Sequence, residues 1–218
     1  MRNSWVNWGR NQRCAPEQLA RPNTHDEVAK LVCLGVAKSK QVRAVGAGHS
    51  FSPLCPTEGI MIDLSNFNSI TKVDPQKLQV TVGAGIRLFD LNEKLESLGL
   101  ALPNLGDIDC QSLAGAISTG THGTGLNYHS ISQAVIGLKI ITGDGGTLEC
   151  SSSQNQDLFE VARVSLGSLG VIVEITLQCV PAFHLRATEQ TTHIENVLDL
   201  FTDAIRTVSY THLRAHET

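Results

Sequence analysis

The sequence predicts an α+β fold. Segments with helical spacing alternate with short runs of β-branched and apolar residues, and few of them repeat as strict β-α units. The 218 residues are 41% hydrophobic and 17% charged, which supplies enough apolar side chains for a sizeable core. Nineteen glycines and an aromatic content of 5% indicate many turns and close backbone approaches. We therefore expect small sheets and short helices joined by glycine-rich loops.

The helices are predicted by apolar spacing and by capping residues. Thr24 and Glu27 form a capping box at the start of the first helix. Gly99 follows the last residue of a helix whose leucines share one face, as a terminating glycine should. The expected helices cover residues 24–36, 87–98, 157–164 and 194–205.

The strands are predicted by short β-branched or alternating runs bounded by turn residues. One hairpin turns at Asp74-Pro75, and another turns at Gly143-Asp-Gly-Gly146, a strong turn sequence. The expected strands cover residues 41–45, 59–64, 70–73, 77–82, 134–142, 147–150 and 170–180.

Two glycine-rich segments stand out as candidate binding loops. Ser112–Gly125 carries four glycines among small hydroxyl residues, and Gly46–Ser50 reads Gly-Ala-Gly-His-Ser. The longer segment is predicted to be a loop, because its composition suits neither a core nor a helix. Uncharged N–H and O–H donors beside glycines suit the phosphates and ring edges of a dinucleotide.

Composition argues against several other classes of protein. The formal net charge of -4 and the lack of a Lys/Arg run argue against nucleic-acid binding. The sequence has no apolar stretch of membrane-spanning length and no signal-peptide pattern. Six dispersed cysteines without a Cys-x-x-Cys pair argue against a zinc site or a redox dithiol. Reduced thiols and a cytoplasmic location are therefore expected.

A Rossmann-type NAD site and a P-loop are also rejected. The glycine pattern of Gly46–Phe51 lacks its third glycine, and the Ser-Pro-Leu-Cys-Pro that follows cannot open a helix. Gly83–Leu88 precedes a helix but again lacks the third glycine. Asp107 and Asp109 lie in a loop rather than at the end of a second strand.

An ordered series of motifs nevertheless resembles a known family. The motifs are Trp5-x-Asn7-Trp8, Val45–Ser50, Val82–Gly85, Leu102–Asp107, Ser112–Gly125 and Leu166–Ile172. Together they resemble the FAD-binding (PCMH-type) domain of the vanillyl-alcohol-oxidase type flavoproteins. The chain is most similar to the aldonolactone oxidoreductases, which include gulonolactone, arabinonolactone and galactonolactone enzymes, with alditol oxidase nearby. This resemblance implies two packed α/β subdomains with FAD extended between them.

The resemblance also implies which residues contact FAD. They are Val45, Gly46, Ala47, Gly48, His49, Ser50, Asp107, Ser112, Gly115, Ser118, Thr119, Gly120, Thr121, His122, Gly170 and Ile172. In this family the histidine at the position of His49 often bonds covalently to the 8α-methyl group of the flavin, and a neutral imidazole is a suitable nucleophile. The alternative, a hydrogen-bonding loop histidine beside noncovalent FAD, stays open. No metal site is expected, because His122 and His129 have no third ligand at a suitable spacing.

The implied activity is oxidation of a CH–OH group in a sugar-1,4-lactone, such as D-arabinono- or L-gulono-lactone, or in an alditol. Hydride would pass to the flavin, and oxygen or another acceptor would reoxidise it. Some eukaryotic members associate with a membrane, and nothing in this sequence requires that. A nonenzymatic FAD-binding electron-transfer subunit and a truncated, nonfunctional product are the alternatives.

Three regions are expected along the chain. Residues 1–185 form the FAD-binding domain, and residues 186–207 begin a substrate (cap) domain. Residues 208–218 resemble a sequencing adapter translated in one frame, and we exclude them from fold reasoning. Because the family's substrate-facing base comes largely from the cap and C-terminal segments, no catalytic residue is expected in this chain, and it should be inactive by itself.

Overall fold

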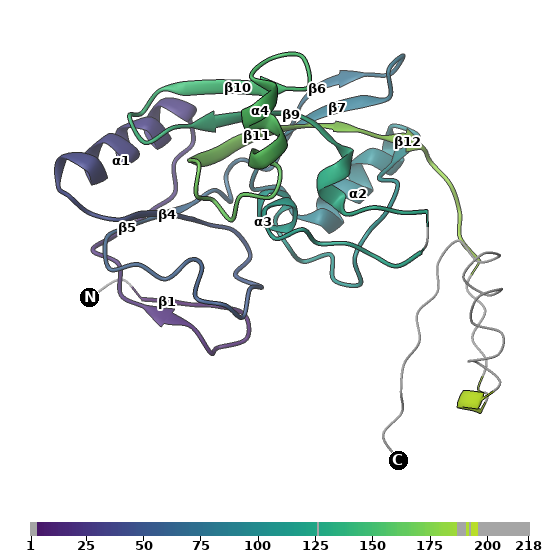
Figure 1. Ribbon diagram of the computed structural model, residues 1–218, viewed down its shortest axis with the longest axis horizontal. Helices are drawn as coiled ribbons and strands as arrows, with labels where there is room; N and C mark the ends of the chain where they lie inside the picture. Colours follow the sequence, from purple (N-terminus) through teal and green to yellow (C-terminus); the bar gives the residue numbers. More distant parts are fainter. Residues whose placement is uncertain (1–3, 126, 187–190, 192, 196–218) are drawn as a thin grey trace.

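The computed structural model describes residues 4–125, 127–186, 191 and 193–195. Its larger sheet is antiparallel throughout, with the strand order β10-β9-β11-β7-β6 (Figure 1). These strands are β6 (Ile70–Asp74), β7 (Gln79–Gly83), β9 (Val135–Ile141), β10 (Thr147–Ser151) and β11 (Val171–Gln178). The predicted hairpins form β6–β7 and β9–β10. The mixed helix and strand content confirms the α+β class.

A smaller parallel sheet has the order β3-β5-β4. Its strands are β3 (Gln18–Ala20), β4 (Val42–Val45) and β5 (Ile60–Asp63). Helix α1 (His25–Ala37) connects β3 to β4 and contacts both β5 and β9, so it joins the two sheets. Gly35 allows the close packing of α1 on β4, because a Cβ there would lie 2.2 Å from a methyl of Val42.

The capping signals locate the ends of the helices. The backbone N–H of Glu27 donates to Oγ1 of Thr24 at 3.2 Å, and the N–H of Asn23 donates to the Glu27 carboxylate at 2.7 Å. Helix α2 (Leu88–Ser97) buries one leucine face, and Gly99 follows it with φ of +70°. Helix α4 spans Gln156–Ala162. Of the helix predicted over 194–205, only residues 194–195 lie among the described residues.

The prediction that Ser112–Gly125 is a loop throughout is wrong. Residues Leu113–Ser118 form helix α3, and a 3-10 turn, η1 (Ile131–Ala134), lies further along the chain. The side chains of Leu113, Ala116 and Ile117 are fully buried, at i, i+3 and i+4. Three apolar residues at this spacing stabilise a short helix despite the neighbouring glycine and hydroxyl residues, because the core covers their shared face.

The sequence did not indicate several short strands. They are β1 (Trp5–Val6) paired with β2 (Arg13–Cys14), β8 (Leu100–Ala101) paired with β12 (Val180–Pro181), and β3. Buried residues from both sheets and from α2 and α3 form one hydrophobic cluster. Among the described residues, no helix is both long and apolar enough to cross a bilayer.

Candidate cofactor-binding site

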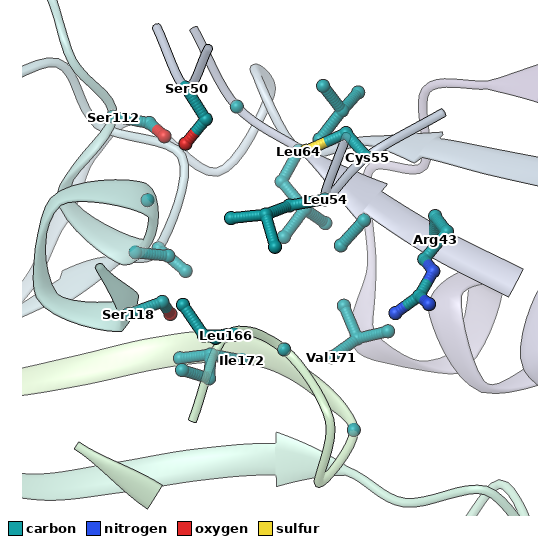
Figure 2. A pocket seen from close by; sticks show the side chains of 18 of the residues that line it. Arg43, Ser50, Leu54, Cys55, Leu64, Ser112, Ser118, Leu166, Val171 and Ile172 are labelled. Atoms are coloured by element: carbon teal, nitrogen blue, oxygen red, sulfur yellow. The ribbon is translucent and has the colours of Figure 1, made fainter. Parts of the chain in front are cut away.

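A cavity of about 480 Å³ opens where the parallel sheet, helix α3 and one end of β11 meet (Figure 2). Its lining comes mainly from residues 41–50, 111–112, 114–115, 118–119, 141–143 and 166–172, with further residues Trp5, Val32, Ser52, Leu54, Cys55, Leu64, Ala84 and Gly85. None of these described lining residues is Asp or Glu, and the single permanent cation among them is Arg43. The cavity is therefore suited to an uncharged or anionic ligand.

The first wall is the loop that follows β4, and it packs directly against the start of α3. A Cβ on Gly46 would lie 1.8 Å from Oγ of Ser112, so only glycine permits this approach. Gly48 has φ of +69°, and its carbonyl accepts a 2.8 Å hydrogen bond from the N–H of Trp8. The loop is thus held on both sides by segments far away in the sequence.

The second wall is helix α3 and the turn that precedes it. The N–H of Leu113 donates to the carbonyl of Ile86, and the N–H of Ala114 donates to that of Ala84, which ties α3 to the end of β7. Along the cavity, α3 presents small residues, among which the Ser118 hydroxyl faces inward (Figure 2). Small residues here leave room for a ligand to approach backbone and hydroxyl donors.

The third wall is the start of β11 and the turn before it. Gly170 has φ of +137°, and a Cβ there would lie 2.4 Å from the carbonyl oxygen of Ile141, so a glycine is needed. The side chains of Val171 and Ile172 face Leu54 across the cavity (Figure 2). A bulge between Ile172 and Glu174 shifts the register with β9 beside the cavity. These side chains form an apolar slot between the two sheets.

His49 is the lining residue best suited to covalent chemistry. Its imidazole stacks on the Trp8 indole, with 5.1 Å between ring centroids and 19° between planes. Burial of the imidazole, together with the nearby Arg87 guanidinium, lowers the pKa of His49 below its usual range. The ring is therefore neutral at pH 7 and keeps a nucleophilic nitrogen.

The structure brings most of the predicted site residues to one cavity. Those that line it are Val45, Gly46, Ala47, Gly48, His49, Ser50, Ser112, Gly115, Ser118, Thr119, Gly170 and Ile172. Four others lie outside this lining: Asp107, Gly120, Thr121 and His122. Asp107 lines a separate cavity of about 260 Å³, and the exposed His122 places Nδ1 2.7 Å from the carbonyl of Gly123. Contact of any of these residues with a cofactor stays a prediction.

Several lining residues had no sequence signal as ligand contacts. Arg43, Leu54, Cys55, Leu64 and Gln111 enter the lining through the arrangement of the sheets.

A cavity with glycine backbone, hydroxyl donors and an apolar slot, and with no carboxylate among its described lining residues, fits a dinucleotide. Fold and site together therefore define a dinucleotide-binding domain of a non-Rossmann, α+β kind. Residues 16–151 match the family model described as "FAD binding domain". The chain belongs to this FAD-binding family, and FAD is the dinucleotide that it binds.

Relatives with known names cover most of this chain. It is 44% identical over 193 residues to L-gulonolactone oxidase of Bos taurus, covering 88% of this chain and 44% of that protein. It is 39% identical over 195 residues to L-gulono-1,4-lactone dehydrogenase of Mycobacterium tuberculosis, covering 89% and 45%. It is 36% identical over 197 residues to D-arabinono-1,4-lactone oxidase of Kluyveromyces lactis, covering 88% and 38%. The chain thus spans less than half the length of these relatives.

A solved structure shares the fold. Chitooligosaccharide oxidase superposes with a TM-score of 0.71 at 24% identity, covering 81% of this chain and 38% of that one. This likeness supports the PCMH-type fold.

Proposed function

We propose that this chain is the FAD-binding part of an oxidoreductase that oxidises a CH–OH group of a sugar-1,4-lactone or an alditol. The carrying observation is the cavity itself, to which all the ordered motifs except Leu102–Asp107 contribute, in a chain 44% identical to an L-gulonolactone oxidase. The named relatives include oxidases and a dehydrogenase, so oxygen and another acceptor are both compatible with the proposal.

The lining residues supply binding and positioning. The backbone of Gly46–Ser50 and the hydroxyls of Ser112, Ser118 and Thr119 would hold the diphosphate and sugar groups of FAD. Val171 and Ile172 would exclude water from the flat rings. When bound, FAD supplies the hydride acceptor.

The described lining residues include no Asp, Glu, Lys or Tyr to take the substrate's hydroxyl proton, and His49 is the single imidazole. We therefore propose that residues 1–218 bind FAD without oxidising the lactone by themselves. Turnover of L-gulono-1,4-lactone by the purified chain would contradict this.

The proposed activity itself is tested with a chimera in which residues 1–193 replace the matching part of the bovine relative. The chimera should oxidise a sugar lactone or an alditol, and full FAD loading without any such oxidation would contradict the proposed activity.

His49 is proposed to bond covalently to the flavin. One ring nitrogen would join the 8α-methyl carbon, while one methyl hydrogen and the imidazole N–H proton leave with two electrons. Dioxygen would accept them as hydrogen peroxide. The neutral state of His49 and its stacking on Trp8 support this assignment, since both keep a ring nitrogen unprotonated and in place.

Fluorescence on a denaturing gel tests the covalent bond. Flavin emission should migrate with the parent chain and with His122→Ala, a histidine variant outside the cavity lining. It should be lost in His49→Ala. A parent chain that binds FAD but releases all of it on denaturation would overturn the covalent assignment and leave FAD binding intact.

A further inference from the structure

Arg43 is the one permanent cation in the cavity lining, and neither the motifs nor the proposed function uses it. It lies on β4, and its guanidinium points into the cavity toward Val171 (Figure 2). Its Nε is buried and has no hydrogen-bond partner in the part of the chain that the structure describes. A buried guanidinium donor without a partner is destabilising, so a ligand that accepts its hydrogen bonds would be favoured here.

No anionic protein group offsets Arg43 from within the lining. The lining contains no Asp or Glu among its described residues, and the Cys55 thiol, which also lines the cavity, interacts electrostatically with Arg43. Burial raises the pKa of Cys55 against the opposing effect of Arg43, so the thiol stays neutral at pH 7. The cation is left available for an acceptor on the ligand.

The position of Arg43 distinguishes the two ends of the cavity. The hydroxyls of Ser50, the neighbour of His49, and of Ser112 lie together at the end opposite Arg43 (Figure 2). Arg43 precedes Gly46 by three residues of extended chain, which is roughly 10 Å at about 3.3 Å per residue. If the diphosphate lies at the glycine loop and the flavin at His49, the adenosine half must extend toward Arg43.

We propose that Arg43 binds the adenine base of FAD and so fixes the direction in which the dinucleotide lies in the cavity. This inference rests on the proposed function, because the flavin end is assigned from His49. The planar guanidinium can stack on the adenine or donate to its ring nitrogens, and the apolar side chain of Val171, toward which it points, can pack against a flat base (Figure 2). Adenine offers three ring-nitrogen acceptors, and Arg43 offers only donors.

The test compares the two halves of FAD as separate ligands. Apoprotein carrying His49→Ala, which cannot form the proposed bond at residue 49, is titrated with FAD, ADP and FMN, with and without Arg43→Met. We expect Kd for FAD and ADP to rise about tenfold, which corresponds to roughly 1.4 kcal/mol, and Kd for FMN to change less than twofold. Arg13→Met, an exposed arginine variant outside the lining, should change none of the three.

Either of two results with Arg43→Met would overturn the assignment. A loss of FMN affinity equal to the loss of ADP affinity would mean that Arg43 acts on the phosphates or on the fold. Unchanged ADP affinity would mean that Arg43 does not contact adenosine.

Arg43→Lys keeps the charge but lacks the planar fork, so it should bind ADP as weakly as Arg43→Met does. Full recovery by lysine would indicate a phosphate contact instead and contradict the proposal. A parent that binds FMN but not FAD would contradict the dinucleotide site itself, which is a separate failure.

Discussion

Replacing Gly46 by alanine should disrupt the cavity through Ser112. A Cβ at position 46 would lie 1.8 Å from Oγ of Ser112 and 2.9 Å from its Cβ, whereas ordinary contacts begin at 3.4 Å. Rotation of the serine hydroxyl relieves only the first overlap. The second still leaves the two carbons 0.5 Å too close, so the loop or the start of α3 must move.

The magnitude follows from the packing at this point. Ser112 is only 3% exposed and precedes α3, so the overlap cannot be relieved into solvent. Overpacking of this kind costs about 1–3 kcal/mol, and we expect Gly46→Ala to lose that much stability and to bind FAD at least tenfold more weakly. Urea unfolding and FAD titration measure the two effects.

A double-mutant cycle tests the stated cause. Ser112→Gly removes both overlapping atoms, so it should recover at least about 1 kcal/mol of the loss caused by Gly46→Ala. Gly143→Ala is the matched control, because Gly143 lines the same cavity and its added Cβ would meet no atom within 4 Å. If the effects of Gly46→Ala and Ser112→Gly add independently, the steric explanation is refuted.

Three further predictions concern other parts of the molecule. Covalent flavin attachment, followed by gel fluorescence, should speed up as pH rises through the lowered pKa of His49 and level off above that pKa. Arg87→Gln should shift the rise to higher pH, and an unshifted profile would argue against the electrostatic effect. Burial tends to raise the pKa of Glu174, but a threonine hydroxyl and the Lys139 ammonium, 2.9 Å away, lower it overall. The stabilisation from Glu174 should therefore be present above pH 4.5 and be lost as pH falls through the folded pKa. Glu174→Gln should be less stable than the parent at pH 7 and equal to it in strong acid, as judged by denaturant midpoints, and a pH-independent difference would count against the ion pair. Thr24→Ala should lower the free energy of unfolding by about 1 kcal/mol, measured in urea, without changing FAD affinity; a change in affinity would show that α1 influences the cavity.

Short sequence signals correctly predicted the elements whose ends are set by neighbouring residues. The capping box at Thr24 and Glu27 and the glycine after α2 located helix ends, and the turn sequences located both hairpins. Helix α3 was missed because the glycines and hydroxyl residues dominated the interpretation, although Leu113, Ala116 and Ile117 already had helical spacing. The two- and three-residue strands were missed because each depends on a partner segment far away in the sequence.

The candidate site was predictable where it follows a motif and unpredictable where it depends on strand order. Gly46–Ser50 reaches the cavity because β4 ends there. His122 belongs to the same glycine-rich segment as Ser118, but α3 ends between them and the chain leaves the cavity lining. In the sequence, Arg43 stands in a strand where a solvated arginine would look the same. It lines the cavity because of how the parallel sheet and the start of β11 are arranged in the fold.

The glycines of the motifs position the cavity walls as well as offering donors. At Gly46, Gly85 and Gly170 an added Cβ would lie between 1.8 and 2.4 Å from atoms of another segment, namely the Ser112 hydroxyl and the carbonyl oxygens of Leu64 and Ile141. Each of these close approaches joins two segments that line the same cavity. Because protein atoms already occupy the space a Cβ would need, glycine is required at these positions even without a ligand. We therefore expect the donor-rich turns to bind the flavin dinucleotide from positions that this packing fixes, and no helix long enough to present a strong dipole is required.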